Sequence, residues 1–210
     1  MDAALHLVRY LKGNSDRGIF FPASSSFQLK AYCDADWANC VDSRRSLTGY
    51  CIFLGDSLVS WKTKKQTTVA RSTAEAEYRS LGTTACELRW ISYLLQDLCV
   101  PVSTPIPLDC DNQAALHIVA NPVFHERTKH LEIDCHLVRD HFKAGFILPS
   151  HVSSRCQLAY LFTKLLPASV FSNMLSKMGL SSFPQVHLEG GMLKTAAANS
   201  GSPLIDARDG

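Results

Sequence analysis

The sequence predicts an α/β fold in which a mixed five-stranded sheet is flanked by helices. Two observations lead to this prediction. Residues 27–65 contain short runs in which apolar and polar residues alternate, separated by turn residues, as is typical of consecutive strands. A long segment of helical periodicity follows, and beyond residue 100 short apolar runs alternate with helical segments. The resulting order of three strands, helix, strand, one or two helices, strand and helix is typical of a mixed sheet with helices packed on it.

The N-terminal segment is expected to precede the main domain. Residues 2–12 have apolar residues at helical spacing, and Gly13 is a candidate C-cap for this helix. A serine-rich stretch, PASSSF, then indicates a boundary. We expect residues 1–26 to be a connecting segment, residues 27–180 to be the domain, and residues 181–210 to be a disordered tail, because the tail lacks periodicity and is rich in small residues.

Three strands open the domain. The first starts at Phe27, the second comprises GYCIFLG, and LVSWKTKK returns as a hairpin after the turn GDS. The stretch TTVA is either the tail of the third strand or a short connector.

A long helix begins the second half, with Ser72 or Thr73 as the candidate N-cap. Its apolar stripe advances by three or four residues and comprises Tyr78, Leu81, Ala85, Leu88, Ile91 and Leu95. PIPLDCD predicts a strand, NQAALHIVA predicts a short helix, and a second helix carries Leu131, Cys135, Val138 and Phe142. GFILPSHV is a strand candidate, and QLAYLFTKLL predicts a helix with Leu158, Leu161, Phe162 and Leu165 on one face.

Composition excludes several classes of protein. The 210 residues include 46% hydrophobic and 19% charged residues, which is ordinary for a soluble globular protein. A net charge of +2 is too small to indicate a nucleic-acid-binding protein by itself, so any basic surface must be local. No apolar run approaches the roughly 18 residues of a membrane span. The eight cysteines are scattered without a CxxC pair, which favours an intracellular protein over one with a disulfide framework.

Three acidic residues share a common context. Asp34 ends the first strand, Asp111 ends the PLDC strand, and a glutamate lies in the first turns of the long helix. Neighbouring strands lie about 4.8 Å apart, so carboxylates at adjacent strand ends would repel one another unless a cation neutralised them. Hard divalent ions, Mg²⁺ above all, prefer such oxygen ligands. The alternative interpretation of Asp34 and its neighbour Asp36 is a turn or a solvated loop.

Two glutamates compete for the helix position. Glu77 lies four residues before Leu81 and beside Tyr78, so it borders the apolar stripe. Glu75 projects with Arg79 away from the stripe. Glu77 is therefore preferred, and Glu75 is the alternative. The competing interpretation is that both glutamates belong to a solvated first turn and complement the helix dipole.

Several motifs together resemble one known family. They are, in order, AYCDADWANCVDSRRSLTGYCIFLG, SWKTKKQTTVARSTAEAEYRSL, LDCDNQAAL, RTKHLEIDCHLVRD and QLAYLFTK. Their order and spacing resemble the ribonuclease H domain of copia-type long-terminal-repeat retrotransposon polyproteins, over roughly residues 27–180. The leading AALHLVRYLKG resembles the end of the reverse transcriptase that precedes this domain in the polyprotein. The sequence has no polymerase aspartate motif, so DNA synthesis by this chain is excluded.

The resemblance implies a ribonuclease H-like fold and hydrolysis of the RNA strand of RNA–DNA hybrids, with two Mg²⁺ or Mn²⁺ ions held by four carboxylates. It implies Asp34, Glu77 (or Glu75) and Asp111 as three of the metal ligands. The fourth is expected in the last motif, where this chain has Tyr160 in place of aspartate. Because a neutral phenol replaces a carboxylate poorly on Mg²⁺, we expect either an impaired nuclease or a catalytically dead relic that at most binds nucleic acid.

A basic stretch is a candidate nucleic-acid contact. No acidic residue lies between Ser57 and Ala74, and four cations and a tryptophan suit a phosphate track with a stacking ring. A solvated face is the alternative interpretation. The candidate contacts are Arg44, Arg45, Trp61, Lys62, Lys64, Lys65, Arg71, Asn112 and Gln113.

Histidines offer weaker candidates. His151, before the last predicted helix, would assist protonation of the leaving group or be a plain surface residue. His125, His130, Cys135 and His136 lie close together in the sequence, and His125 and His130 imitate half of a zinc-finger pattern. The second pair with cysteine spacing is missing, so zinc is not favoured.

Overall fold

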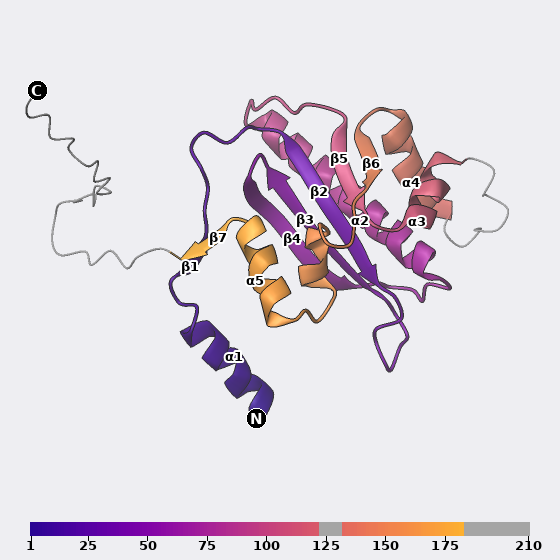
Figure 1. Ribbon diagram of the computed structural model, residues 1–210. Helices are drawn as coiled ribbons and strands as arrows, with labels where there is room; N and C mark the ends of the chain where they lie inside the picture. The colour runs from indigo at the N-terminus through magenta and orange to yellow at the C-terminus, as the bar shows by residue number, and fades with distance from the viewer. Residues whose placement is uncertain (122–131, 183–210) are drawn as a thin grey trace, which may run out of the picture.

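The computed structural model describes residues 1–121 and 132–182 (Figure 1). Its centre is a five-stranded sheet with the order β4-β3-β2-β5-β6. The strands are β2 (Leu29–Asp36), β3 (Leu47–Leu54), β4 (Ser57–Lys65), β5 (Ile106–Cys110) and β6 (Ile147–His151). β3 is antiparallel to both β2 and β4, whereas β2, β5 and β6 run parallel. The predicted α/β fold with a mixed five-stranded sheet is therefore confirmed.

Helices cover both faces of this sheet. One face carries α2 (Thr73–Asp97), α3 (Gln113–Ala120) and α4 (Glu132–Lys143), and the other carries the short 3₁₀ helix η3 (Leu158–Phe162) and α5 (Ala168–Lys177). Side chains alternate along a strand, so Leu29, Ala31 and Cys33 of β2 pack in the core beneath α2, while Tyr32 packs on the η3 side. Each face of the central strand therefore contributes to a different core.

The long helix forms as the sequence predicts. Ser72 is its N-cap, and the Ser72 hydroxyl accepts a hydrogen bond of 3.2 Å from the Glu75 backbone N–H. Every member of the predicted apolar stripe is buried against the sheet. The packing of this stripe on the sheet therefore fixes the position of α2 relative to the strands.

The end of the domain differs from the prediction of one helix over residues 157–166. The structure has η3, of five residues, and then a separate α5 that begins after Pro167. Proline disfavours helical conformation in the residue before it, so a helix ends ahead of this position. Leu165, expected on the apolar face, is fully exposed. Residues 67–70 (TTVA) form no strand, and they belong to the connector between β4 and α2.

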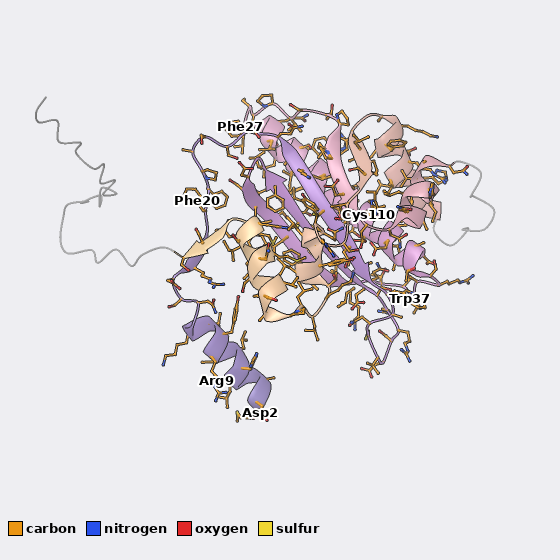
Figure 2. The ribbon with its side chains drawn as sticks, viewed as in Figure 1. Asp2, Arg9, Phe20, Phe27, Trp37 and Cys110 are labelled. Carbon is orange, nitrogen blue, oxygen red and sulfur yellow. The ribbon has the colours of Figure 1, made fainter. Side chains whose placement is uncertain are left out.

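The N-terminal segment adds a helix and a strand. α1 (Asp2–Lys12) forms as predicted, has no buried residue and projects from the body of the domain (Figure 2). β1 (Arg17–Ile19) pairs antiparallel with β7 (Leu180–Ser182), a ladder that the sequence did not predict. Residues 183–210, most of the predicted tail, lie outside the described residues, as does Leu131. Among the described residues, none of the helices combines the length and the hydrophobicity that a bilayer span requires.

Candidate active site

Two aspartates lie at the ends of neighbouring parallel strands. Asp34 is near the C-terminal end of β2, and Asp111 directly follows β5, which pairs with β2 in parallel. Cys110, the last residue of β5, lies inside the domain beside β2 (Figure 2). Parallel strands end at the same edge of a sheet, so both carboxylates reach that edge. The structure thus places the two aspartates on adjacent strands, as the candidate site requires.

The glutamate comes from α2, which packs on β2. The Ser80 hydroxyl donates a hydrogen bond of 2.9 Å to the Asp34 carbonyl oxygen and anchors the helix to the strand. About one turn earlier, Glu77 is 5% exposed, and its Oε2 accepts a hydrogen bond of 3.8 Å from the Cys110 thiol. One potential ligand atom each of Glu77, Cys110 and Asp111 lie within 4.8 Å of one another. Glu77 therefore lies in the same cluster as Asp111.

Glu75 is also buried, but its environment differs. Its carboxylate accepts a hydrogen bond of 2.8 Å from the Arg71 backbone N–H and forms an ion pair of 3.1 Å with Arg79. These contacts stabilise the start of α2, where a negative charge is favourable. The geometry favours Glu77 over Glu75 as a candidate metal ligand. Neither glutamate lies in a solvated turn, because both are at most 5% exposed.

Burial and mutual repulsion perturb the acidic groups of the cluster. Burial first, and then the neighbouring Asp34 carboxylate, raise the pKa of Glu77 to about 10. Burial also raises the pKa of Asp34, by more than the hydrogen bond from Thr163 and the charge of Lys164 lower it. A divalent cation among these oxygens would favour their ionised forms. The donor set of the Glu77 and Asp111 carboxyl groups and the Cys110 thiol, with the Asp34 carboxyl group as an electrostatic neighbour, therefore fits a divalent cation.

A second set of groups approaches the aspartates from η3 and the residues that follow it. The Thr163 hydroxyl donates a hydrogen bond to Asp34 Oδ2, and Lys164 Nζ lies 3.2 Å from Asp34 Oδ1. The Tyr160 hydroxyl donates a hydrogen bond to Asp111 Oδ2. Lys164 Nζ also lies 3.4 Å from the centroid of the Tyr160 ring, which is a cation–π contact. Each aspartate thus has a partner from this segment.

Sequence reasoning singled out Tyr160 but missed Thr163 and Lys164. The signal was present, because both residues follow Tyr160 in the motif QLAYLFTK at helical spacings of three and four. Residues at these spacings share a face of a helical turn, so they meet the same neighbours. Once position 160 is placed at the cluster, the helical spacing predicts that Thr163 and Lys164 also reach it.

One residue anchors η3 to the sheet, and a second allows η3 to approach it closely. Gln157 is fully buried, and its side chain donates a hydrogen bond of 2.9 Å to the Cys33 carbonyl oxygen and accepts one of 3.1 Å from the backbone of η3. Gly49 of β3 is the partner of Asp34 in the sheet register, and a Cβ atom there would lie 2.5 Å from Thr163 Cγ2. The close approach of Thr163 to Asp34 therefore requires glycine at position 49.

The basic residues of β4 do not form one continuous track. Lys62, Lys64 and Lys65 are exposed on this edge strand, and Trp61 is half exposed. Side chains alternate along the strand, so Lys62 and Lys64 lie on the α2 face, where Lys64 borders a pocket with Arg79. Trp61 lies on the η3 face and lines an apolar cavity there. Alternation thus separates the stacking ring from two of the lysines.

The other candidate contacts lie near the same sheet edge or on loops. His151 is exposed at the end of β6 and is the partner of Cys110 in the sheet register. Asn112 is the N-cap of α3, and its side chain accepts a hydrogen bond of 3.0 Å from a backbone N–H of that helix. Gln113 follows it and is exposed. The exposed loop candidates are Arg44, Arg45 and Arg71.

The zinc pattern falls mostly outside the described residues. This applies to His125 and His130 and to the side chain of Cys135. Among the side chains that the structure describes, one group of three potential ligands is found, formed by Glu77, Cys110 and Asp111.

Three of the curated relatives are polyproteins from plant transposons. The retrovirus-related Pol polyprotein from transposon RE1 of Arabidopsis thaliana is 42% identical over 184 residues, which are 88% of this chain and 13% of the relative. The corresponding polyprotein from transposon RE2 of the same plant is 43% identical over 183 residues, 87% of this chain and 13% of the relative. The polyprotein from transposon TNT 1-94 of Nicotiana tabacum is 32% identical over 181 residues, 86% of this chain and 14% of the relative. The chain thus spans 13–14% of the length of these relatives.

Two of the solved structures that match part of the chain are ribonuclease H proteins. RNase H1 from Halobacterium salinarum NRC-1 has a TM-score of 0.45 and 14% identity, and the match covers 63% of this chain and 90% of that one. The N-terminal RNase H domain of a Mycobacterium tuberculosis protein has a TM-score of 0.48 and 11% identity, and the match covers 72% of this chain and 98% of that one. No family model matches the chain. The resemblance seen in the sequence is nevertheless confirmed: over most of its length the chain is homologous to the retrovirus-related Pol polyproteins of copia-type transposons, and it has the expected mixed five-stranded sheet flanked by helices.

Proposed function

We propose that this chain is a ribonuclease H domain that hydrolyses the RNA strand of RNA–DNA hybrids by a two-metal mechanism, and that Tyr160 impairs this activity. The observation that carries the proposal is the meeting of Asp34, Glu77 and Asp111 at one edge of the sheet. Homology to retrovirus-related Pol polyproteins supports the same assignment, because the sequence resemblance implies a reverse transcriptase ahead of this domain, and reverse transcription produces RNA–DNA hybrids.

The three carboxylates are the groups that would hold divalent cations. Oxygen ligands of this kind suit Mg²⁺ and Mn²⁺. Bound cations would supply an activated water and stabilise the leaving 3′ oxygen of an in-line displacement. The chain holds Asp34 and Asp111 on paired strands and fixes α2 to β2 through Ser80. The buried Cys110 thiol donates a hydrogen bond to Glu77 and lies on the core side of the cluster.

Tyr160 weakens this arrangement for two reasons. It contributes no negative charge, although two divalent cations carry four positive charges and three carboxylates balance only three of them. Its hydroxyl also occupies Oδ2 of Asp111. Burial, together with the hydrogen bond to Asp111, raises the pKa of Tyr160 above its ordinary value, so the side chain stays a neutral phenol at neutral pH. We therefore expect the cation on the Asp111 side to bind weakly.

The proposed substrate would contact exposed basic residues near the site. Lys62 and Lys64 lie along the α2 side of the edge strand, where they would meet backbone phosphates. His151, beside Cys110 at the end of β6, is a secondary candidate for protonating the leaving group. The partner in the parent polyprotein would be the reverse transcriptase, to which residues 1–26 would connect this domain.

The alternative proposal is a catalytically dead relic that at most binds nucleic acid. The loss of the fourth carboxylate at Tyr160 favours it, whereas the presence of Asp34, Glu77 and Asp111 favours residual activity.

A cleavage assay on an RNA–DNA hybrid, with Mg²⁺ or Mn²⁺, separates the proposals. The unmodified chain should bind hybrid and cleave it slowly or not at all, with Mn²⁺ supporting more cleavage than Mg²⁺. Tyr160→Asp should increase cleavage, because it supplies the missing carboxylate and frees Asp111. Rapid cleavage by the unmodified chain in Mg²⁺ would show that Tyr160 is not at a ligand position. A Tyr160→Asp protein that binds hybrid but does not cleave it would support the relic.

A further inference from the structure

The positive charge beside Asp34 comes from the chain itself. The Asp34 residue is 0% exposed, and a buried carboxylate requires a nearby cation or hydrogen-bond donors. Lys164 Nζ lies 3.2 Å from Asp34 Oδ1, and the lysine side chain is 34% exposed, so the ammonium approaches from the solvent side. The Thr163 hydroxyl binds the other oxygen of the same carboxylate. Both oxygens of Asp34 are therefore occupied by this one segment.

The Tyr160 ring fixes the ammonium in this place. A lysine stem has several rotatable bonds, and holding it in one conformation costs entropy. The ring of Tyr160, 3.4 Å from Lys164 Nζ, offsets this cost through a cation–π contact. Burial lowers the pKa of Lys164, but the charge of Asp34 and the hydrogen bond to Tyr160 raise it by more. Lys164 is therefore an ammonium at neutral pH.

We propose that Lys164, held by the Tyr160 ring, is a built-in counter-ion that replaces a divalent cation at Asp34 and has to be displaced before such a cation binds there. This inference rests on the proposed metal site. Two features would then lower the affinity of the site for divalent cations. One is the loss of the fourth carboxylate, and the other is the competing charge of Lys164. The counter-ion also explains how the fold tolerates a fully buried aspartate when no metal is bound.

Two opposite effects of one substitution follow from the proposal. Lys164→Met keeps the length and apolar stem of the side chain but removes its charge, so Asp34 loses its counter-ion. The metal-free protein should become less stable, because a buried charge without a partner is costly. The same change removes the competitor, so divalent cations should bind more tightly and restore the lost stability. A surface lysine with no role at the site would show neither effect.

The experiment compares Lys164→Met with Lys143→Met, which makes the same change at an exposed residue of α4. Titration calorimetry with MgCl₂ and MnCl₂, without nucleic acid, should show binding to Lys164→Met that is about tenfold tighter or more than to the unmodified chain, as expected when a like charge at close range is removed. In EDTA the melting temperature of Lys164→Met should fall by roughly 5 °C or more. Lys143→Met should match the unmodified chain in both measurements.

A double variant keeps the test valid if Lys164→Met folds poorly. Asp34→Asn/Lys164→Met removes both charges, so in EDTA it should be more stable than Lys164→Met alone. Additive effects of the two single changes would overturn the counter-ion role. Unchanged cation affinity in Lys164→Met, with measurable binding to the unmodified chain, would also overturn it and leave the proposed function standing. Absence of cation binding in every variant would overturn both.

Discussion

The two sides of the carboxylate cluster are built differently. On the α2 side, Glu77 and Cys110 belong to a long helix and a central strand, and both are buried. On the η3 side, Tyr160 and Lys164 belong to a five-residue 3₁₀ helix and the irregular segment after it. The first side is positioned by the core of the domain, whereas the second is positioned by a few specific contacts. From this comparison we expect substitutions of Tyr160 or Lys164 to change the chemistry of the site more than they change the fold.

The largest effect is expected at Asp34, which both sides share. In the Tyr160→Asp background, Asp34→Asn should reduce hybrid cleavage to the level seen with EDTA, because it removes the ligand at the centre of the cluster. The assay is cleavage of a labelled hybrid in Mn²⁺. Asp36→Asn makes the same change two residues further on, where the carboxylate contacts Asn39, and should leave cleavage intact. Equal loss in both variants would refute the assignment of Asp34.

The α2 side should control how stability depends on pH. The pKa of Glu77 is raised to about 10, above its unfolded value, so the folded protein retains a proton that the unfolded chain releases. In the absence of metal, the contribution of Glu77 to the free energy of unfolding should be greatest below about pH 4.5. It should decrease as the pH rises toward 10, by up to about 1.4 kcal/mol per pH unit.

Glu77→Gln should remove this part of the slope in denaturant unfolding measured at several pH values. Glu75→Gln is the matched control on the same helix. It breaks the ion pair with Arg79, so it should lower stability without flattening the slope. If the two variants share one pH profile, Glu77 is not the perturbed group.

The η3 side should be sensitive to crowding at Gly49. Gly49→Ala places a methyl group 2.5 Å from Thr163 Cγ2 and 2.8 Å from Phe162 Cβ, so we expect a loss of about 1–3 kcal/mol in the free energy of unfolding. Chemical denaturation measures this loss. Adding Thr163→Ser removes the nearer methyl group but keeps the hydroxyl, and should recover part of the stability. No recovery would mean that η3 is not pressed against β3 at this point.

The smallest effect is expected on the edge strand. Changing Lys62, Lys64 and Lys65 together to alanine should weaken hybrid binding and reduce the log–log salt slope by about 1 for each phosphate that is no longer neutralised. A filter-binding titration at several salt concentrations measures the slope. Trp61→Ala, on the face of the strand opposite to Lys62 and Lys64, removes no charge and should leave the slope unchanged. An unchanged slope in the triple variant would show that these lysines form a solvated face.

Sequence reasoning was most successful where local pattern and tertiary structure agree. Asp34 and Asp111 stand at the ends of strands with clear alternation, and Glu77 borders a stripe whose every member is buried, so their convergence followed from element geometry. The contacts of Thr163 and Lys164 could not be predicted in the same way. They depend on where η3 ends, at Phe162, and on the close approach to Gly49.

The β1–β7 ladder was missed for a related reason. Each strand has three residues, too few for an alternating pattern, and the two strands come from opposite ends of the described chain. Short pairings of this kind are decided by the packing of the elements around them, which no local window of sequence contains.

That ladder also determines how the domain is tethered. The backbone enters the domain at Arg17–Ile19 and leaves it at Leu180–Ser182, and these two segments are hydrogen-bonded side by side. A force applied to the two ends of the chain would therefore act on the β1–β7 hydrogen bonds before it reaches the central sheet. A protease that cuts between residues 20 and 28 would not release the N-terminal piece at once, because strand pairing would still hold it to the domain.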